Sequence, residues 1–420
     1  MKKKIWIFHP YATPTEIIGL TRPYDLSKEL KKRGYEVTIF GSSYLHYISK
    51  NLINDQKMYI SEKYEGIEFI FIKTRTYTNN GIERIKNFVD YYINLNKYIK
   101  KLGKKDIPDI IYASSPHPLA LLSGIKNSRK LKIPCIGEIR DFWPEVFFLG
   151  GKFKEKTLIG KLLLKGEKYL YKNLNALIFL KEGDKEYIKE HKWSLEQGGD
   201  IDLKKIYYIN NGVDLDEFDK NLNEYKYQDE DLESEKFKII YIGAIRKVNN
   251  IERIVEVAKK IKMEEIEFLI FGDGNERAIL ELKCKKEGID NVKFKGYVEK
   301  KYIPYILSKA NLNILNYSQS EYNWKRGNSS NKLFEYMASG KPILSTVKMG
   351  YSIIEKYKCG LELETENIDE FYHKILEMKN MTKEKYRLMG LNARNGVKNF
   401  TYERLGEKLL EVIEKEVSKC

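Results

Sequence analysis

Short apolar runs alternate with longer amphipathic stretches over most of this chain, and this alternation narrows its possible folds more than any other feature. In the first half, the runs with strand character are IWIF, EVTIF, IEFIFI, DIIYAS, PCIGEI and ALIFL. The stretches with helical spacing between them lie near 20–33, 82–102, 118–130 and 156–173. Strands separated by helices predict a parallel, doubly wound α/β sheet.

The alternation starts again after a polar, acidic stretch at 219–236, DKNLNEYKYQDEDLESEK. Runs such as FKIIYIG and EFLIFG are again followed by helical spacing, near 250–262 and 275–287. A chain of 420 residues is also too long for one ordinary core. We therefore expect two Rossmann-like domains, 1–218 and 219–398. A ligand shared by two such domains would lie in the cleft at the carboxyl ends of their strands.

Cysteine spacing and hydropathy limit the class of protein. The four cysteines form no CxxC pair and lie far apart, at Cys135, Cys284, Cys359 and Cys420. This pattern argues against a disulfide framework and a structural zinc site, and it fits a reducing cytoplasm. No apolar run approaches the length of a membrane span, so we expect a soluble or peripheral protein.

Positive charge is concentrated in the N-terminal half. The net charge is +15, and residues 1–200 carry 36 Lys and Arg against 23 Asp and Glu. A basic face attracts polyanions, either nucleic acid or an anionic lipid surface. A solvated lysine-rich surface explains the same composition, and from charge alone this is the favoured interpretation.

One acidic residue interrupts an apolar helical stripe in SSNKLFEYMASGKPIL, residues 329–344. The stripe consists of Leu333, Phe334, Met337 and Ala338. Ser329 or Ser330 could cap this helix, whereas Glu335 within the stripe needs a partner for its carboxylate. Upstream, GAIRKVNN and FGDGNER each follow a strand, and such glycine loops suit either an ordinary turn or a bound phosphate.

These motifs in this order resemble the C-terminal domain of the family-4 glycosyltransferases, which have the GT-B fold. The matching strings are GAIRK, FGDG, VKFKGYV, SSNKLFEYMASGKPIL and RLMGLNARNGVKNFTYERL. INNGVDLDEF resembles the interdomain motif of that family. In the first half, PDIIYASSPHP and EIRDFWPE resemble a subgroup that works on bacterial surface polysaccharides and often has Asp-Leu-Trp-Pro. The resemblance implies two Rossmann-like domains facing across a cleft, with a helix at 399–420 crossing back to the first.

The resemblance also implies how a nucleotide sugar is held. Glu335 matches the glutamate that accepts hydrogen bonds from the ribose hydroxyls, and Arg246 and Lys247 match a clamp on the diphosphate. The remaining implied donor-binding residues are Gly19, Gly272, Asp273, Gly274, Val298, Ser330, Asn331 and Lys332. One departure is clear, because the family has a first glutamate where this chain has Gly327, and Arg326 or Asn328 is expected to replace its contact.

Three residues of the first half are the candidates for catalysis. His117 follows the DIIYAS strand, where the family has a histidine near the transferred sugar, although lone histidines are usually structural. In EIRDFWPE, Asp141 is our candidate to accept a proton from the acceptor hydroxyl or to position it, and Glu138 lies close by. Trp143 could stack on a sugar or fill the core.

No metal or other cofactor is expected. Three Asp-x-Asp strings occur, at 200–202, 214–216 and 229–231, but they lie in linkers or in the NGVDLDEF motif. Cations of the protein should therefore balance the diphosphate. The family resemblance also implies a retaining reaction without an obvious protein nucleophile.

A basic amphipathic segment at 150–173 suggests a membrane surface. Lysines such as Lys152, Lys154 and Lys156 surround an apolar side in GGKFKEKTLIGKLLLKGEKYLYKN. Such a helix can lie on an anionic bilayer or cover a sheet with a solvated lysine face. We favour contact with the inner face of the cell membrane.

The resulting expectation is a hexosyltransferase that uses a UDP-linked hexose or N-acetylhexosamine. Its acceptor would be a growing glycan, on a polyprenyl diphosphate or another lipid, for capsule, O-antigen or exopolysaccharide. The alternatives are a nucleotide-sugar epimerase on the same fold and a basic nucleic-acid-binding protein. The latter lacks a recognisable helix-turn-helix, so no nucleic-acid partner is expected.

Overall fold

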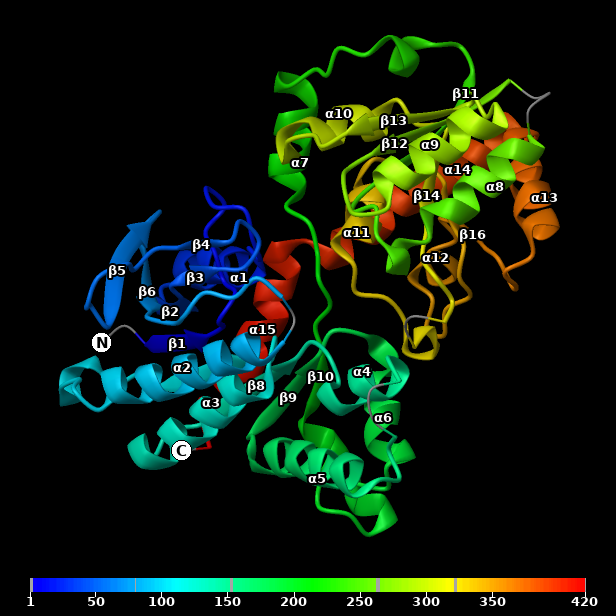
Figure 1. The fold of residues 1–420 in the computed structure, drawn as a ribbon. Helices are drawn as coiled ribbons and strands as arrows, with labels where there is room; N and C mark the ends of the chain where they lie inside the picture. The colour runs from blue at the N-terminus through cyan, green and yellow to red at the C-terminus, as the bar shows by residue number, and fades with distance from the viewer. Residues whose placement is uncertain (1–2, 80, 152–153, 262–264, 321–322, 420) are drawn as a thin grey trace. The chain divides into compact units, whose positions relative to one another are not determined.

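The computed structural model describes residues 3–79, 81–151, 154–261, 265–320 and 323–419 (Figure 1). The chain divides into two compact units. Unit 1 comprises 1–180, 184–210 and 402–420, and unit 2 comprises 181–183 and 211–401. The C-terminal residues therefore belong to the same unit as the N-terminal half.

Unit 1 is built on an eight-stranded sheet with the order β10-β9-β8-β7-β1-β2-β6-β5. All its neighbours pair in parallel except β5 and β6. Its strands are β1 (Lys4–Phe8), β2 (Glu36–Ser42), β5 (Tyr59–Tyr64), β6 (Ile67–Ile72), β7 (Ile110–Ser114), β8 (Cys135–Ile139), β9 (Ala176–Phe179) and β10 (Ile206–Tyr208). A small hairpin pairs β3 (Tyr44–Leu45) with β4 (Lys50–Asn51).

Helices cover both faces of this sheet. One apolar core joins alternate strand residues to helices α2 (Ile82–Ile99), α3 (Pro118–Leu131), α5 (Leu158–Asn173) and α6 (Lys185–Glu190). A second core, on the other face, joins the remaining strand residues to α1 (Arg22–Lys32) and α15 (Tyr402–Val417). Helix α4 (Trp143–Leu149) lies between β8 and α5 in the chain. Burial on both faces explains why the strands read as continuous apolar runs.

Unit 2 has a six-stranded, all-parallel sheet with the order β13-β12-β11-β14-β15-β16. The strands are β11 (Phe237–Ile242), β12 (Ile266–Phe271), β13 (Val292–Gly296), β14 (Leu312–Leu315), β15 (Ile343–Ser345) and β16 (Gly360–Glu362). The helices are α7 (Leu215–Glu224), α8 (Ile251–Lys260), α9 (Arg277–Glu287), α10 (Ile303–Ser308), α11 (Asn331–Ala338), α12 (Ile353–Lys356), α13 (Ile368–Lys379) and α14 (Lys383–Gly396).

The prediction of two doubly wound α/β sheets is confirmed. The sequence did not indicate β5, which has mostly exposed polar residues and pairs antiparallel at the sheet edge. The short strands β3, β4 and β16 were also missed, because two or three residues carry little periodic signal. Within the described ranges, no helix has both the length and the apolar character needed to span a bilayer.

Candidate functional site

The strand order of unit 2 locates one candidate site. From β11, the strands β12 and β13 follow outward on one side of the sheet, whereas β14, β15 and β16 follow outward on the other side. The direction in which successive strands are placed therefore reverses between β11 and β14. Ligands of open parallel sheets bind beyond the carboxyl ends of the strands at such a switch point. Here Asn316, just after β14, donates hydrogen bonds to the carbonyls of Asn249 (2.6 Å) and Asn250 (2.7 Å) after β11. The two loops are thereby joined at this edge of the sheet.

The predicted glycine loops pack directly on each other. A Cβ atom at Gly272, where φ is +134°, would lie 1.9 Å from the carbonyl oxygen of Gly243. A Cβ atom at Gly274 would lie 2.1 Å from the carbonyl oxygen of Ile245. Asp273 is exposed and accepts a hydrogen bond from the Gly274 N–H at 2.8 Å. Contact between the loops therefore requires both glycines, whether or not a phosphate binds there.

Lys332 lies against the first of these loops, between two aromatic rings. Its Nζ atom is 4.6 Å from the ring centre of Tyr241 and 4.7 Å from that of Tyr317. It also donates a hydrogen bond to the Tyr241 hydroxyl at 3.1 Å. Burial lowers the pKa of Lys332 to about 7. The rings stabilise the cation without neutralising it, which leaves its charge for an anionic ligand.

Glu335 lies one turn further along α11 and has an unsatisfied carboxylate. Burial raises the pKa of Glu335, although the charges of Lys300 and Lys332 lower it. Among the described residues, none donates a hydrogen bond to this carboxylate. A shielded acid without donors is costly, and a ligand that brings hydroxyl groups would satisfy it.

The start of α11 is not capped as the sequence suggested. Ser330 occupies the N-cap position, but its side chain makes no capping hydrogen bond, so the expectation of a serine cap is wrong. Its Oγ atom is buried without a hydrogen-bond partner, and its N–H donates to Oδ1 of Asn328 at 2.7 Å. Asn331, the first helical residue, is exposed. The amides of this first turn and the helix dipole favour an anion at this end.

Gly327 has a backbone conformation that explains its departure from the family pattern. Its φ is +101°, in a region that side chains strain, so a glutamate could not simply replace it. The neighbours Arg326 and Asn328 are both buried. Arg246 and Lys247 are exposed at the end of the β11 loop, and Val298 is half-buried after β13.

In unit 1, His117 is the N-cap of α3 and directly follows β7, which neighbours β1 in the sheet. The side chain is fully buried and stacks on Phe88, with ring centres 4.1 Å apart. Neither ring nitrogen has a hydrogen-bond partner, and burial lowers the pKa of His117 to about 3. The imidazole is thus neutral at physiological pH.

The sequence reasoning missed His9, which has the same properties. It follows β1 directly, is fully buried, and has two ring nitrogens without partners. Burial and the nearby Arg140 lower the pKa of His9 to about 3. Its position after the first strand, before Pro10, was the signal available in the sequence.

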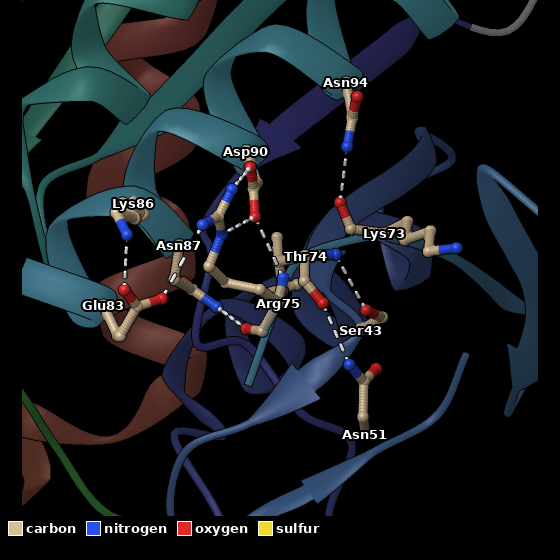
Figure 2. A network of polar contacts seen from close by, with 11 residues as sticks. Ser43, Asn51, Lys73, Thr74, Arg75, Glu83, Lys86, Asn87, Asp90 and Asn94 are labelled. Carbon is tan, nitrogen blue, oxygen red and sulfur yellow. Dashed lines mark hydrogen bonds and ion pairs between the residues drawn. The ribbon is translucent and has the colours of Figure 1, made fainter. Parts of the chain in front are cut away.

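A polar network holds the segment after β6, residues 73–75, in place (Figure 2). The Arg75 guanidinium binds the Asp90 carboxylate through two hydrogen bonds, at 2.7 and 3.0 Å, and thereby joins the segment to α2. The Thr74 N–H donates to Ser43 Oγ at 3.0 Å, and its carbonyl accepts from Asn51 at 2.9 Å. Three residues after Thr74, Tyr77 contacts other aromatic residues of the same unit, Tyr11, Tyr44 and His46.

Glu138 is held by protein groups on both of its oxygens. It forms an ion pair with Arg22 at 2.8 Å and accepts hydrogen bonds from Tyr112 and from Ser114 (2.7 Å). It is buried, and although burial opposes ionisation, the Arg22 and Arg140 charges hold its pKa well below the usual range. This arrangement favours a role for Glu138 in positioning Arg22 rather than in proton transfer.

The last two predicted residues of unit 1 are more accessible. Asp141 is exposed just after β8, whereas Glu138 is buried within that strand. Gly19 is half-buried in the loop after β1, which Thr13 N–H closes by donating to the Leu20 carbonyl at 3.1 Å. Trp143 touches Phe88 and Phe147 edge to face, so it packs within unit 1.

Two family models match the chain. Residues 21–217 match the model described as Glycosyltransferase Family 4, and residues 224–396 match Glycosyl transferases group 1. Each matched region lies mainly in one unit, and together the two regions include the candidate residues described above except His9 and Gly19. No curated protein matches the sequence significantly.

Solved structures share the fold over nearly the whole length. Sucrose-phosphate synthase from Thermosynechococcus elongatus is 16% identical, with a TM-score of 0.73 and 100% of both chains covered. HepE from Anabaena, solved with UDP and glucose, is 14% identical, with a TM-score of 0.65, and 99% of this chain and 100% of HepE are covered. WaaG, a glycosyltransferase of lipopolysaccharide biosynthesis, is 13% identical, with a TM-score of 0.62, and 98% and 99% are covered. These are structures of the GT-B fold.

Proposed function

Because this chain is a GT-B glycosyltransferase similar to family 4, we propose that unit 2 binds a nucleoside diphosphate sugar as the donor. The solved relatives include a complex with UDP and glucose, which supports UDP as the nucleotide. We propose a hexose or N-acetylhexosamine as the sugar, transferred with retention of configuration.

The observation that carries this proposal is the presence on α11 of a lysine and a glutamate that form no ion pair with any described residue. The Lys332 ammonium rests on two tyrosine rings, and the Glu335 carboxylate has no donor among the described residues. A nucleoside diphosphate supplies the complement of both, with anionic phosphates for the lysine and a ribose diol for the glutamate. The amides of Asn331 and Lys332, in the first turn of α11, add further donors for phosphate oxygens.

The same groups would assist the transfer itself. As the bond between the sugar and the diphosphate breaks, negative charge develops on the leaving oxygen. Lys332, Arg246 and the α11 amides would stabilise that charge, and the diphosphate would take the proton of the acceptor hydroxyl. The acceptor oxygen would form the new glycosidic bond to the sugar carbon that the diphosphate leaves, without a protein nucleophile.

We propose that cations of the protein, rather than a metal ion, balance the diphosphate. The three Asp-x-Asp strings serve as caps of short or longer helices. Asp202, Asp214 and Asp229 accept hydrogen bonds from the N–H groups of Lys204, Glu217 and Asp231, respectively. Within the described ranges, no group of three or more His, Cys, Asp or Glu could hold a metal ion.

For the acceptor, we propose a growing, lipid-linked glycan of the cell surface at the inner face of the membrane. The relationship in fold to WaaG and the positive charge of residues 1–200 support this proposal. Asp141 remains the candidate to position the acceptor hydroxyl, because it is exposed beside the end of β8.

The donor proposal is tested by thermal unfolding with UDP, GDP and dTDP. A ligand that binds only the folded protein raises its melting temperature, and we expect UDP to do so. Glu335→Gln should weaken UDP binding by about 1.5–3 kcal/mol, the usual contribution of a hydrogen bond to a charged group.

Glu299→Gln is the matched control, because it removes an exposed carboxylate of the same unit that pairs with Lys301. It should leave UDP binding unchanged. If no nucleoside diphosphate stabilises the wild-type protein, or if the two variants behave alike, the proposed donor site is refuted.

A further inference from the structure

A cavity of about 300 Å³ lies entirely within unit 1, among helices α3, α4 and α5. Its walls are almost wholly hydrocarbon. They include Leu121 and Leu122 of α3, Phe147 of α4, and Leu163 and Leu170 of α5, with the indole of Trp143 beside them. A cavity of this volume and lining takes an apolar chain rather than a sugar or a phosphate.

Glu167 is one of two acidic residues in this wall, with Asp141, and neighbouring groups satisfy it. Its two oxygens accept hydrogen bonds from the hydroxyls of Tyr171 (2.7 Å) and Tyr187 (2.6 Å). Burial raises the pKa of Glu167 to about 7. The carboxyl group is therefore turned into a closed hydrogen-bond network, and the cavity surface stays apolar.

The surface of α5 near the cavity is both apolar and basic. Leu158, Ile159 and Leu162 are 84%, 52% and 69% exposed, which is unusual for large apolar side chains on consecutive turns. Lys161 and Lys165 are exposed on the same helix, next to these residues, and have no ion-pair partner among the described residues. Hydrocarbon next to unpaired lysines is complementary to an amphiphile with an anionic head group.

Asp141 gives the cavity a direction. It lines the cavity and is also exposed at the end of β8. For a lipid-linked acceptor whose hydrocarbon chain lies in the cavity, the glycan hydroxyl that Asp141 is proposed to position would lie at the cavity rim, whereas an acyl chain of the bulk bilayer needs no such residue at its binding site.

We propose that this cavity binds the hydrocarbon chain of a lipid-linked acceptor, at the segment next to its phosphate groups. This inference rests on the proposed function, because it assigns the acceptor side of the same transfer. The chain would be held among α3, α4 and α5, and Lys161 and Lys165 would lie close to its phosphates.

Gly166 of α5 provides a precise test. It lines the cavity, and a Cβ atom at this position would meet no atom within 4 Å. Gly166→Phe therefore has room for its ring at the cavity wall and should obstruct the cavity without disturbing the helix, since glycine is a poor helix former. Gly166→Ala is the matched control, because it adds a single methyl group.

Farnesyl diphosphate is the probe, and its binding is measured by calorimetry against inorganic diphosphate. The wild-type protein and Gly166→Ala should bind farnesyl diphosphate at least ten-fold more tightly than inorganic diphosphate. Gly166→Phe should lose this preference while its melting temperature and its stabilisation by UDP stay unchanged. The UDP measurement separates this proposal from the proposed donor site. If the donor site is wrong, UDP will stabilise neither the wild-type protein nor either variant.

Two results would overturn the inference. One is equal binding of farnesyl diphosphate by Gly166→Phe and Gly166→Ala. The other is a Gly166→Phe variant that keeps farnesyl diphosphate binding but loses sedimentation with phosphatidylserine vesicles, because the cavity would then hold a bilayer acyl chain.

Discussion

At the residue scale, the environment of Lys332 sets its chemistry. Burial lowers its pKa to about 7, against the opposing charge of Glu335, whereas its place in the sequence, three residues before Glu335, suggested only that it faces the ligand. A lysine with this pKa is partly neutral in the free protein at physiological pH. Binding of an anion would restore its charge, so binding and protonation are linked.

This linkage predicts a pH dependence of UDP binding. Below pH 7 the lysine is already protonated, so its contribution to affinity is full. Above pH 7 the free protein must take up a proton to bind, and affinity should fall by up to about ten-fold per pH unit between pH 7 and 9. Calorimetry in buffers of different ionisation enthalpy would measure the proton uptake.

Lys332→Met is the control for this effect, since it removes the titrating group but keeps the length of the side chain. Its weaker UDP binding should be nearly independent of pH across the same interval. An affinity of the wild-type protein that stays constant from pH 7 to pH 9 would contradict the assignment.

At the scale of elements, Arg22 joins three parts of unit 1. It is the first residue of α1, and its guanidinium binds Glu138 of β8 and the carbonyls of Ile209 (3.0 Å) and Asn210 (2.5 Å) after β10. All of these groups are buried or in the backbone of a buried segment. These contacts of Arg22 hold α1 in a fixed position relative to β8 and to the segment after β10, although the three parts are far apart in sequence.

Removing one partner of this pair should strongly destabilise the protein. Glu138→Gln leaves the buried Arg22 charge without its carboxylate, and we expect a loss of about 3–5 kcal/mol in the free energy of unfolding. Urea denaturation at neutral pH measures it. The wild-type pair should keep its effect until the pH falls below the usual pKa of a carboxyl group, because the folded pKa of Glu138 is depressed.

Glu36→Gln is the matched substitution in the same sheet. Glu36 is 57% exposed and lies 4.0 Å from Lys4, so its removal should change stability by no more than about 1 kcal/mol. Equal losses for the two variants would show that the buried pair has no special importance.

At the scale of the whole molecule, the excess of positive charge lies in residues 1–200. The exposed apolar residues of α5 are in the same region, so charge and hydrocarbon occur together there. For a protein proposed to act on a lipid-linked glycan, this combination indicates how it reaches its acceptor. Of the lysines named for this segment, Lys152 lies outside the described residues.

Neutralising Lys161 and Lys165 together as glutamines should weaken binding to phosphatidylserine vesicles. Each lysine near an anionic surface contributes about 1 kcal/mol, so the loss should be about 2 kcal/mol, or roughly thirty-fold, in a sedimentation assay at physiological salt. Lys285→Gln with Lys286→Gln on α9 removes the same net charge from exposed positions of unit 2 and should have little effect. A similar loss in both double variants would mean that net charge alone determines binding.

The amino-acid sequence by itself determined the two α/β sheets and most of their elements. Buried parallel strands such as β7 and β12 must be continuous apolar runs, and the helices between them must be amphipathic, so both leave a periodic signal. The resemblance to a family placed Glu335 and Lys332 in one site. Their spacing on a short helix is local, and local relations are readable in a sequence.

Only the tertiary structure decided which groups are satisfied. It showed that Glu138 is held by Arg22, 116 residues away in sequence, that His9 shares the buried state of His117, and that α3, α4 and α5 enclose a cavity. It also showed that Gly272 is required by the carbonyl of Gly243. These facts depend on contacts between segments that are distant in the chain, and a pattern along the sequence does not contain such distances.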